Sequence, residues 1–122
     1  MNKFASTCFL WTELECKCGC GNRYIQTAAI NKLQLMRNLI GKPIIINSAA
    51  RCPIHNTTVG GAPKSQHRAT ESRPSTAFDI ALNGHTSKHD LITLAKQVGF
   101  KGLGTKYNSF VHVDNRKVPA IW

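Results

Sequence analysis

Residues 77–82 read Ala-Phe-Asp-Ile-Ala-Leu and form the clearest strand pattern of the chain. Because neighbouring side chains of a β-strand point to opposite faces, Phe78, Ile80 and Leu82 share one face and Asp79 lies on the other. The apolar face predicts packing against a hydrophobic core. The stretch therefore predicts a core strand that presents a carboxylate on its other face.

Further short strands are predicted on both sides of this one. Residues 109–114 read Ser-Phe-Val-His-Val-Asp, and strand alternation puts His112 and Asp114 on the same face. Residues 118–122 predict another strand, with residues 115–117 as the turn between the two. Upstream, the β-branched run at residues 44–48 predicts a short strand that is buried on both faces.

Two helices are predicted as well. Apolar residues recur mostly three or four positions apart up to residue 40, and Gly41 ends this run. A second helix is expected after Thr86 or Ser87, with Asp90 near its start and Gly99 at its end. Together the elements predict one α+β domain over residues 1–122, with two principal helices and a small, mostly antiparallel sheet.

The segment between the first two predicted strands has a different character. Residues 51–75 show almost no hydrophobic periodicity and contain three prolines and a Gly-Gly pair. This pattern predicts a long loop. Structureless stretches of this length are uncommon in compact domains and are usually functional when they occur.

Composition limits the possible functions. The chain has 122 residues, of which 42% are hydrophobic, so one domain with a real core is expected. Sixteen Lys and Arg against six Asp and Glu give a net charge of +10, which favours anionic partners. No run approaches the roughly 18 apolar residues of a membrane span, so no transmembrane segment is expected. The apolar patch at residues 8–11 is too short for a signal peptide, and we expect none.

Three residues have the chemistry of metal ligands. His67 lies in the long loop, whereas Asp79 and His112 lie in predicted strands. A catalytic Zn²⁺ takes three protein ligands from His, Asp or Glu and leaves a fourth position to water. Residue type alone does not decide the matter, because a His in a strand is more often a packed or surface side chain.

Four motifs, taken in order, are more specific. Residues 47–56 read Asn-Ser-Ala-Ala-Arg-Cys-Pro-Ile-His-Asn and residues 59–67 read Val-Gly-Gly-Ala-Pro-Lys-Ser-Gln-His. They are followed by Ala-Phe-Asp-Ile at 77–80 and Phe-Val-His-Val-Asp at 110–114. In this order the chain resembles the zinc D-alanyl-D-alanine carboxypeptidase family, especially its small phage and bacterial members, which include L-alanyl-D-glutamate endopeptidases. The resemblance runs from Glu13 to Trp122.

The resemblance implies a function and a set of site residues. It implies a Zn²⁺ held by His67, Asp79 and His112, and hydrolysis of a peptide bond in the peptidoglycan stem by a metal-activated water. Arg51 would hold a substrate carboxylate, since a guanidinium can grip a carboxylate with two hydrogen bonds. Ser65 would support the site by hydrogen bonding, because the neighbouring His67 is assigned to the metal and is not free to act as a base for it.

The chain departs from the family pattern at two places. Eleven residues separate His67 from Asp79, about five more than is usual in the family, and Ser75 stands where the family has Gly. Ser109 occupies the position at which many relatives carry an acidic general base. Asp114 and Glu71 are the remaining candidates for that base. Asp114 could instead orient a metal-bound imidazole or pair with Arg116.

The other candidate ligands give weaker signals. Cys16, Cys18 and Cys20, together with Cys8 or Cys52, could hold a structural zinc ion. Structural zinc sites typically space their cysteines two to four residues apart, so we expect free thiols or a redox-dependent pair instead. His85 and His89 need not share a helix face, because His85 precedes the expected cap. His55 is expected to lie at the surface near the proposed site.

These observations leave three functional classes. The first is a zinc peptidase that acts on stem peptides and docks on anionic cell-wall polymers. It is expected to be a monomer made in the cytoplasm, reaching the wall by holin-type release or with a virion. The second is a non-catalytic wall-binding or virion structural module with the same fold. The third, a nucleic-acid binder, rests on charge alone, because no recognition helix or basic-aromatic motif is present.

Overall fold

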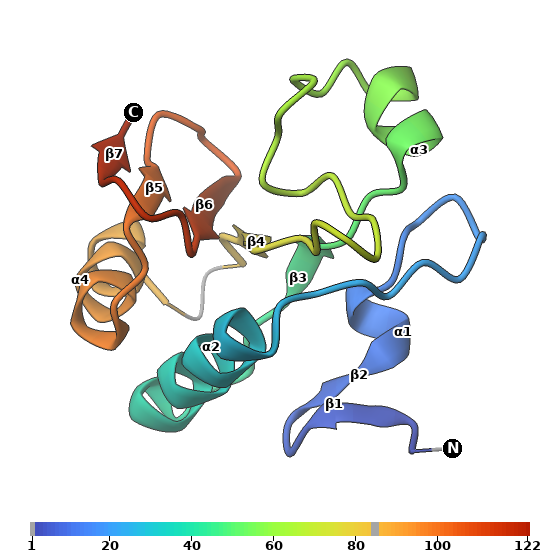
Figure 1. Cartoon of the computed structure of the whole chain (residues 1–122). Coiled ribbons are helices and arrows are strands. Elements are labelled where there is room, and N and C mark those ends of the chain that lie inside the picture. The colour runs from blue at the N-terminus through green and yellow to red at the C-terminus, as the bar shows by residue number, and fades with distance from the viewer. Residues whose placement is uncertain (1, 84–85) are drawn as a thin grey trace.

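A five-stranded sheet forms the centre of the molecule in the computed structural model, which describes residues 2–83 and 86–122 (Figure 1). The strand order is β3-β4-β6-β5-β7, and every neighbouring pair is antiparallel except β5 and β7, which run parallel. The strands span β3 Ile46–Ser48, β4 Ala77–Ala81, β5 Gly102–Gly104, β6 Phe110–Asp114 and β7 Ala120–Ile121.

The pairing of β4 with β6 brings two distant parts of the sequence together. Asp79 lies directly opposite His112, and Ala77 lies directly opposite Asp114. Residues that face each other across an antiparallel pair project from the same side of the sheet. Asp79, His112 and Asp114 therefore share one face, while Phe78 and Ile80 point into the core, as the alternation in residues 77–82 predicts.

Two principal helices enclose the core. They are α2, Thr27–Ile40, and α4, Lys88–Val98, which contact each other. Gly41 and Gly99 end them with φ of 67° and 98°, a backbone conformation that L side chains rarely adopt. The Ser87 hydroxyl caps α4 by accepting a hydrogen bond from the Asp90 backbone N–H at 3.1 Å.

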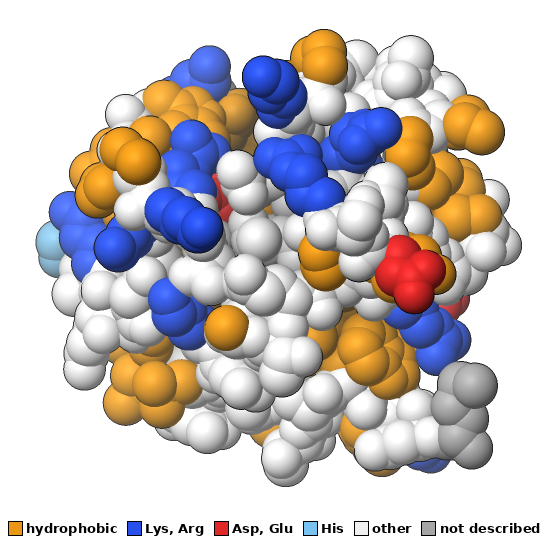
Figure 2. Space-filling model, in the orientation of Figure 1, with side chains coloured by type: hydrophobic (Ala, Val, Ile, Leu, Met, Phe, Trp, Pro, Cys, Tyr) orange, Lys and Arg blue, Asp and Glu red, His pale blue; other side chains and the backbone are white. Residues whose placement is uncertain are grey.

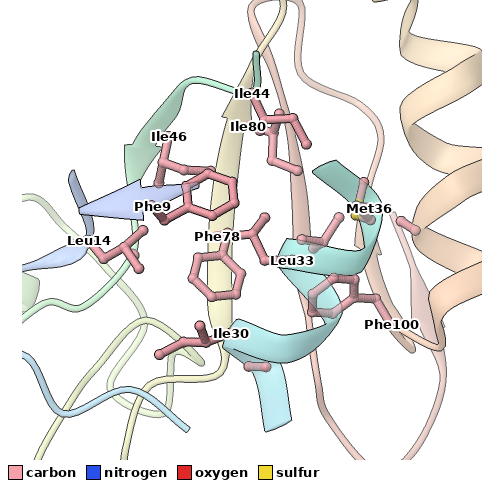
Figure 3. Close-up of a cluster of buried hydrophobic side chains, with 14 of the residues drawn as sticks. Phe9, Leu14, Ile30, Leu33, Met36, Ile44, Ile46, Phe78, Ile80 and Phe100 are labelled. Carbon is pink, nitrogen blue, oxygen red and sulfur yellow. The ribbon is translucent and has the colours of Figure 1, made fainter. Parts of the chain in front are cut away.

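The core lies between these helices and the sheet. Figure 3 shows Leu33 and Met36 of α2 beside Phe78 and Phe100, and all four side chains are buried. The N-terminal segment contributes to the same core through a small hairpin and a short helix. These are β1, Phe4–Ser6, β2, Phe9–Leu10, and α1, Trp11–Leu14. Burial of large apolar side chains in one cluster supplies most of the stability of such a domain.

The structure confirms an α+β fold with a mostly antiparallel sheet, and it corrects three details. Residues 53–58 of the expected loop form a short helix, α3 (Pro53–Thr58), because Pro53 suits a first helical turn and Cys52 caps it. The strand near residue 46 is buried on one face only, since Ile45 is 48% exposed. β7 pairs with β5, which the sequence did not predict, and does not form a hairpin with β6.

Two further expectations from the sequence concern the histidines near α4 and a membrane span. The expectation that His85 and His89 need not share a helix face involves residue 85, which lies outside the described residues. Within residues 2–83 and 86–122, no helix is long and apolar enough to cross a membrane.

Candidate metal centre and substrate cleft

Three side chains from three segments meet on the outer face of the sheet. His67 comes from the segment that precedes β4, Asp79 from β4 and His112 from β6. The Nε2 atom of His67 and the Nδ1 atom of His112 each lie 3.0 Å from Oδ1 of Asp79. One ligand atom from each residue lies within 4.8 Å of the other two, so the three predicted ligands form one cluster that could hold a metal ion.

The chain leaving β3 holds His67 in place. The backbone N–H of Arg51 donates to the His67 carbonyl at 2.8 Å, and the N–H of Ala69 donates to the Arg51 carbonyl at 2.7 Å. The ring Nδ1 of His67 lies 2.7 Å from the carbonyl oxygen of Ala49. These bonds fix both the backbone and the ring of a residue that the sequence places in a loop.

The residues inserted between His67 and Asp79 do not separate the two ligands. The Thr76 N–H donates to the Gln66 carbonyl at 2.9 Å, and the Thr76 hydroxyl donates to the Gln66 side chain at 2.7 Å. The two ends of the segment that contains the insertion therefore lie next to each other, at Gln66 and Thr76. Lengthening a loop in this way costs little closure entropy, which agrees with the expectation that the ligands still converge.

The hydrogen-bond partners of the two histidines define their protonation pattern. A carbonyl can only accept, so Nδ1 of His67 carries the proton that it shares with Ala49. Nε2 of His112 lies 2.7 Å from a carboxylate oxygen of Asp114, closer than the 3.0 Å between Nδ1 and Asp79, so we assign a proton to Nε2 as well. In the neutral rings, the remaining two nitrogens would turn lone pairs toward the same oxygen of Asp79. A cation shared by the three atoms removes that repulsion, so the donor set fits a metal ion.

The electrostatics of the cluster point the same way. Burial alone would raise the pKa of Asp79. Without a metal, however, the facing nitrogens of His112 and His67 can carry protons, and their hydrogen bonds to Asp79 outweigh burial and hold its pKa well below the usual range. Burial alone would lower the pKa of His112, but hydrogen bonds to Asp114 and Asp79 raise it above its ordinary value. The cluster thus contains ionised carboxylates that favour positive charge between them.

Asp114 lies behind His112 and has no exposed surface. Besides His112, its two oxygens accept hydrogen bonds from the backbone and the guanidinium of Arg116, the latter at 2.8 and 2.7 Å. Gly102, opposite Asp114 on β5, leaves the space for this carboxylate, because a Cβ there would overlap it. Burial would raise the pKa of Asp114, but its bonds to Arg116 and His112 hold that pKa below the usual range.

A cleft of about 680 Å³ opens above the three candidate ligands. Among the described residues that line it, Asp79 has the only acidic side chain, whereas several side chains are basic or aromatic. These are Arg51, Lys64, Arg116, Tyr107, Phe110 and Trp122. The cleft therefore offers cations and flat apolar surfaces around a carboxylate that is already engaged by two histidines.

Arg51 lies at the wall of this cleft beside the candidate metal centre. Its Nη2 donates to the Ser65 hydroxyl at 3.2 Å, and the same hydroxyl accepts from the His67 N–H at 3.2 Å. The Nε of Arg51 is buried and has no hydrogen-bond partner among the described residues. Burial lowers the pKa of Arg51, while the nearby Asp79 raises it. Ser65 thus links the guanidinium to the turn that carries His67.

The other predicted residues lie outside the cleft lining. Glu71 and Ser109 are exposed, and the Ser109 carbonyl accepts the backbone N–H of Leu82. His55 lies in α3, and its backbone N–H donates to the sulfur of Cys52 at 3.3 Å. His89 is an exposed residue of α4.

Two aromatic residues of the cleft have no counterpart among the residues singled out from the sequence. Trp122 donates through Nε1 to the Tyr107 hydroxyl at 3.1 Å, and the Arg116 guanidinium lies 4.7 Å from the centre of the Trp122 ring. Tyr107 stacks on Phe110 with ring centres 4.3 Å apart. Tyr107 lies a few residues before His112 in the sequence, which could have identified it as a residue near the site. Trp122 reaches the cleft only because β7 pairs in parallel with β5.

Comparisons with known proteins agree with this geometry. A search of curated protein sequences returns no match to the chain. A family model described as Peptidase M15 matches residues 2–114, a range that includes β4, β6 and all three candidate ligands. Peptidases of that family are in general zinc-dependent. The match confirms the resemblance drawn from the four sequence motifs, and the chain belongs to the peptidase M15 family.

Proposed function

We propose that the protein is a zinc-dependent peptidase that hydrolyses a peptide bond in the stem peptide of peptidoglycan, as an endolysin-like endopeptidase or a D-alanyl-D-alanine carboxypeptidase. The observation that carries this proposal is the cluster of His67, Asp79 and His112 at the floor of a cleft in a chain of this family. Two imidazoles and one carboxylate are a donor set of the type found in catalytic zinc sites, which leave one position open.

The chain's own residues would prepare the metal site. Asp79 and the inward ring nitrogens of His67 and His112 would hold the ion. Ala49 and Asp114 would fix the two rings through their outer nitrogens. A bound Zn²⁺ would supply Lewis acidity toward the scissile carbonyl and lower the pKa of a water to about 7.

Arg51 would anchor a carboxylate of the substrate. It lines the cleft and has a buried Nε without a partner among the described residues. A buried donor of this kind costs free energy unless a ligand satisfies it. Ser65 would keep the guanidinium in place, so it is proposed as a binding residue and not as a nucleophile.

For Asp114 we favour the orienting role over that of general base. Both of its oxygens are engaged by His112 and Arg116, and it has no exposed surface from which to take a proton from a water in the cleft. Glu71 is exposed and does not line the cleft. The proposed hydrolysis therefore depends mainly on the metal and on substrate positioning.

One observation favours the second candidate, a non-catalytic wall-binding or virion module. Asp79 has the only acidic side chain among the described residues that line the cleft, so no other Asp or Glu there could accept a proton. Such a module would bind zinc and cell wall without releasing new chain ends. The experiment below separates the two functions.

The surface charge suits the proposed location. Figure 2 shows Lys and Arg side chains spread over the visible face with few acidic ones, and the chain carries a net charge of +10. Such a field would favour docking on anionic cell-wall polymers over long distances. We propose that the protein acts as a monomer at the bacterial wall, reached by holin-type release or virion delivery, and that it does not bind nucleic acid specifically.

The test is a digest of purified peptidoglycan with the zinc-loaded protein, the chelated protein, and the chelated protein after zinc is restored. The released ends are identified by mass spectrometry. We expect new amine and carboxyl ends in the first and third reactions only, and their identity names the bond. Zinc binding without any new ends would favour the non-catalytic module, and cleavage that persists in the chelator would contradict the proposal.

A further inference from the structure

A second cluster of metal-ligating side chains lies outside the cleft. Cys16, Cys18 and Cys20 belong to the loop that follows α1, and Cys52 lies between β3 and α3. Although Cys16 and Cys52 are far apart in the sequence, the four sulfur atoms all lie within 4.8 Å of one another. The remaining cysteine, Cys8, is exposed and does not belong to the cluster.

The sulfur separations match those of a tetrahedral thiolate site. The sulfur of Cys18 lies 3.4 Å from that of Cys16 and 3.7 Å from that of Cys52. Zinc binds cysteine sulfur at about 2.3 Å, which places two sulfurs of a tetrahedron about 3.8 Å apart. A disulfide would require about 2.05 Å, and all five cysteines are free thiols. The spacing is that of ligands around a common centre.

Turns in the backbone of the loop allow cysteines that are separated by one residue to direct their sulfurs toward a common centre. Gly19, which lies between Cys18 and Cys20, and Gly21, which directly follows Cys20, have φ of 86° and 80°, so the chain turns at both positions. The Gly19 N–H donates to the Cys16 carbonyl at 3.3 Å, and the Cys16 N–H donates to the Asn22 carbonyl at 2.9 Å. One-residue gaps, which would be strained in an extended chain, are accommodated by this turn.

Backbone N–H groups point at two of the sulfurs. Cys52 N–H donates to the Cys16 sulfur at 3.4 Å, and His55 N–H donates to the Cys52 sulfur at 3.3 Å. Hydrogen bonds of this kind stabilise a thiolate, which is the form that binds a metal. Cys16 is buried and Cys52 is half-buried, whereas Cys18 and Cys20 close the cluster from the solvent side.

We propose that Cys16, Cys18, Cys20 and Cys52 bind a structural Zn²⁺ ion, separate from the candidate metal centre in the cleft. Four thiols would release four protons and bind one Zn²⁺, with no change in oxidation state. Four thiolates without an open position are the donor set of a structural zinc site. This structural site does not depend on the proposed catalytic function, because it uses none of the residues of the candidate metal centre in the cleft.

The location suggests what such an ion would do. Cys52 directly follows Arg51, whose backbone is bonded to His67, and Figure 1 shows the loop after α1 on the side of the molecule where α3 begins. A zinc ion would tie this N-terminal loop to the segment that carries Arg51. The ion would thereby support the wall of the cleft by positioning, without touching the substrate.

Metal counting on purified protein tests the proposal. Protein kept reduced and loaded with Zn²⁺ is freed of loosely bound metal, and zinc per chain is measured by mass spectrometry. The variants are a Cys18→Ser, Cys52→Ser double substitution, a His67→Ala, His112→Ala double substitution, and Cys8→Ser as the matched cysteine control. We expect two zinc ions in the wild type and in Cys8→Ser, and one in each double variant.

Cobalt and thiol titration keep the test decisive if the cysteine double variant does not fold. The His67→Ala, His112→Ala variant loaded with Co²⁺ should show thiolate-to-cobalt charge transfer. An organomercurial added to the zinc-loaded Cys8→Ser protein should release one ion as the four remaining thiols react. The proposal would be overturned if the charge-transfer band were absent, or if the wild type bound a single ion that was lost when the two histidines were replaced. It would also be overturned if the site held iron in place of zinc, or if the thiols were paired as disulfides under reducing conditions.

Discussion

The Nε2 atom of His112 lies 2.7 Å from Oδ2 of Asp114, a fully buried carboxylate that Arg116 holds from the other side. The relationship makes the ring nitrogen that faces Asp79 the only one available to a metal. An outer partner of this kind orients a ligand and raises its basicity. The two residues lie two positions apart on β6 and project from the same face, while Gly102 on β5 leaves the space that the carboxylate occupies.

Replacing Asp114 with Asn tests this role. The change removes the charge that orients His112, so we expect zinc affinity to fall about 10- to 100-fold. Competition with a coloured chelator measures the affinity, and Asp90→Asn on the exposed start of α4 is the matched control. If Asp114 were instead the general base, kcat would fall while the zinc affinity stayed at the wild-type value.

Replacing Gly102 with Ala tests the space behind His112. Because the added Cβ would overlap the Asp114 carboxylate, either that carboxylate or β5 must move. Overpacking of this kind typically costs about 1–3 kcal/mol of unfolding free energy. We expect a lower thermal midpoint together with weaker zinc binding. A variant that unfolds and binds zinc like the wild type would show that the position of Asp114 does not matter.

Replacing Arg51 with Lys tests substrate anchoring. A lysine keeps the positive charge but cannot grip a carboxylate with two parallel hydrogen bonds. Hydrogen bonds to charged groups contribute about 1.5–3 kcal/mol, so kcat/KM should fall about 10- to 100-fold. The control is a substrate whose carboxylate is converted to an amide, for which wild type and variant should differ little. Equal loss on both substrates would assign Arg51 a purely structural role.

The metal-free protein should be most stable in mildly acidic solution. The pKa values of Asp79 and Asp114 are lowered in the fold, so their contribution is present above about pH 4, the ordinary carboxyl value, and is lost as the pH falls through the lowered values. The pKa of His112 is raised, so its contribution is complete below about pH 6.5 and is lost as the pH rises through the raised value.

Thermal unfolding of the chelated protein across pH measures this dependence. The midpoint should be highest between about pH 4 and about 6.5 and decline on both sides. Zinc should stabilise the protein more as the pH rises, because the ion competes with protons for the same nitrogens. A chelated protein whose midpoint climbs steadily from about pH 6.5 to 8 would contradict the assigned partners of His112.

Much of the fold could be predicted from local pattern. The alternation in residues 77–82, the helix limits at Gly41 and Gly99 and the Ser87 cap are local signals, and each appears in the structure. β5 could not be predicted, since Gly-Leu-Gly has no strand pattern and the strand exists because β6 and β7 pair with it. The short N-terminal hairpin likewise depends on packing against α2.

The candidate site could likewise be predicted only in part. His67, Asp79 and His112 could be found from motif order, and strand pairing explains why Asp79 and His112 meet. The sequence did not separate the possible roles of Asp114, because these depend on burial and on Arg116. The cysteine cluster could not be judged from spacing, since a turn with two glycines at positive φ changes which sulfurs can meet.

We propose that the charge of Asp79, together with the two histidines, holds the zinc ion on which cleavage of the stem peptide depends. The most direct measurement compares peptidoglycan digests by zinc-loaded wild type, Asp79→Asn and the control Asp90→Asn, with released ends counted by mass spectrometry. We predict new ends from the wild type and Asp90→Asn, and a loss of at least about 100-fold in Asp79→Asn, since a missing ligand should cost more than the roughly 10- to 100-fold of a residue that only orients one. Wild-type cleavage by Asp79→Asn would contradict the account.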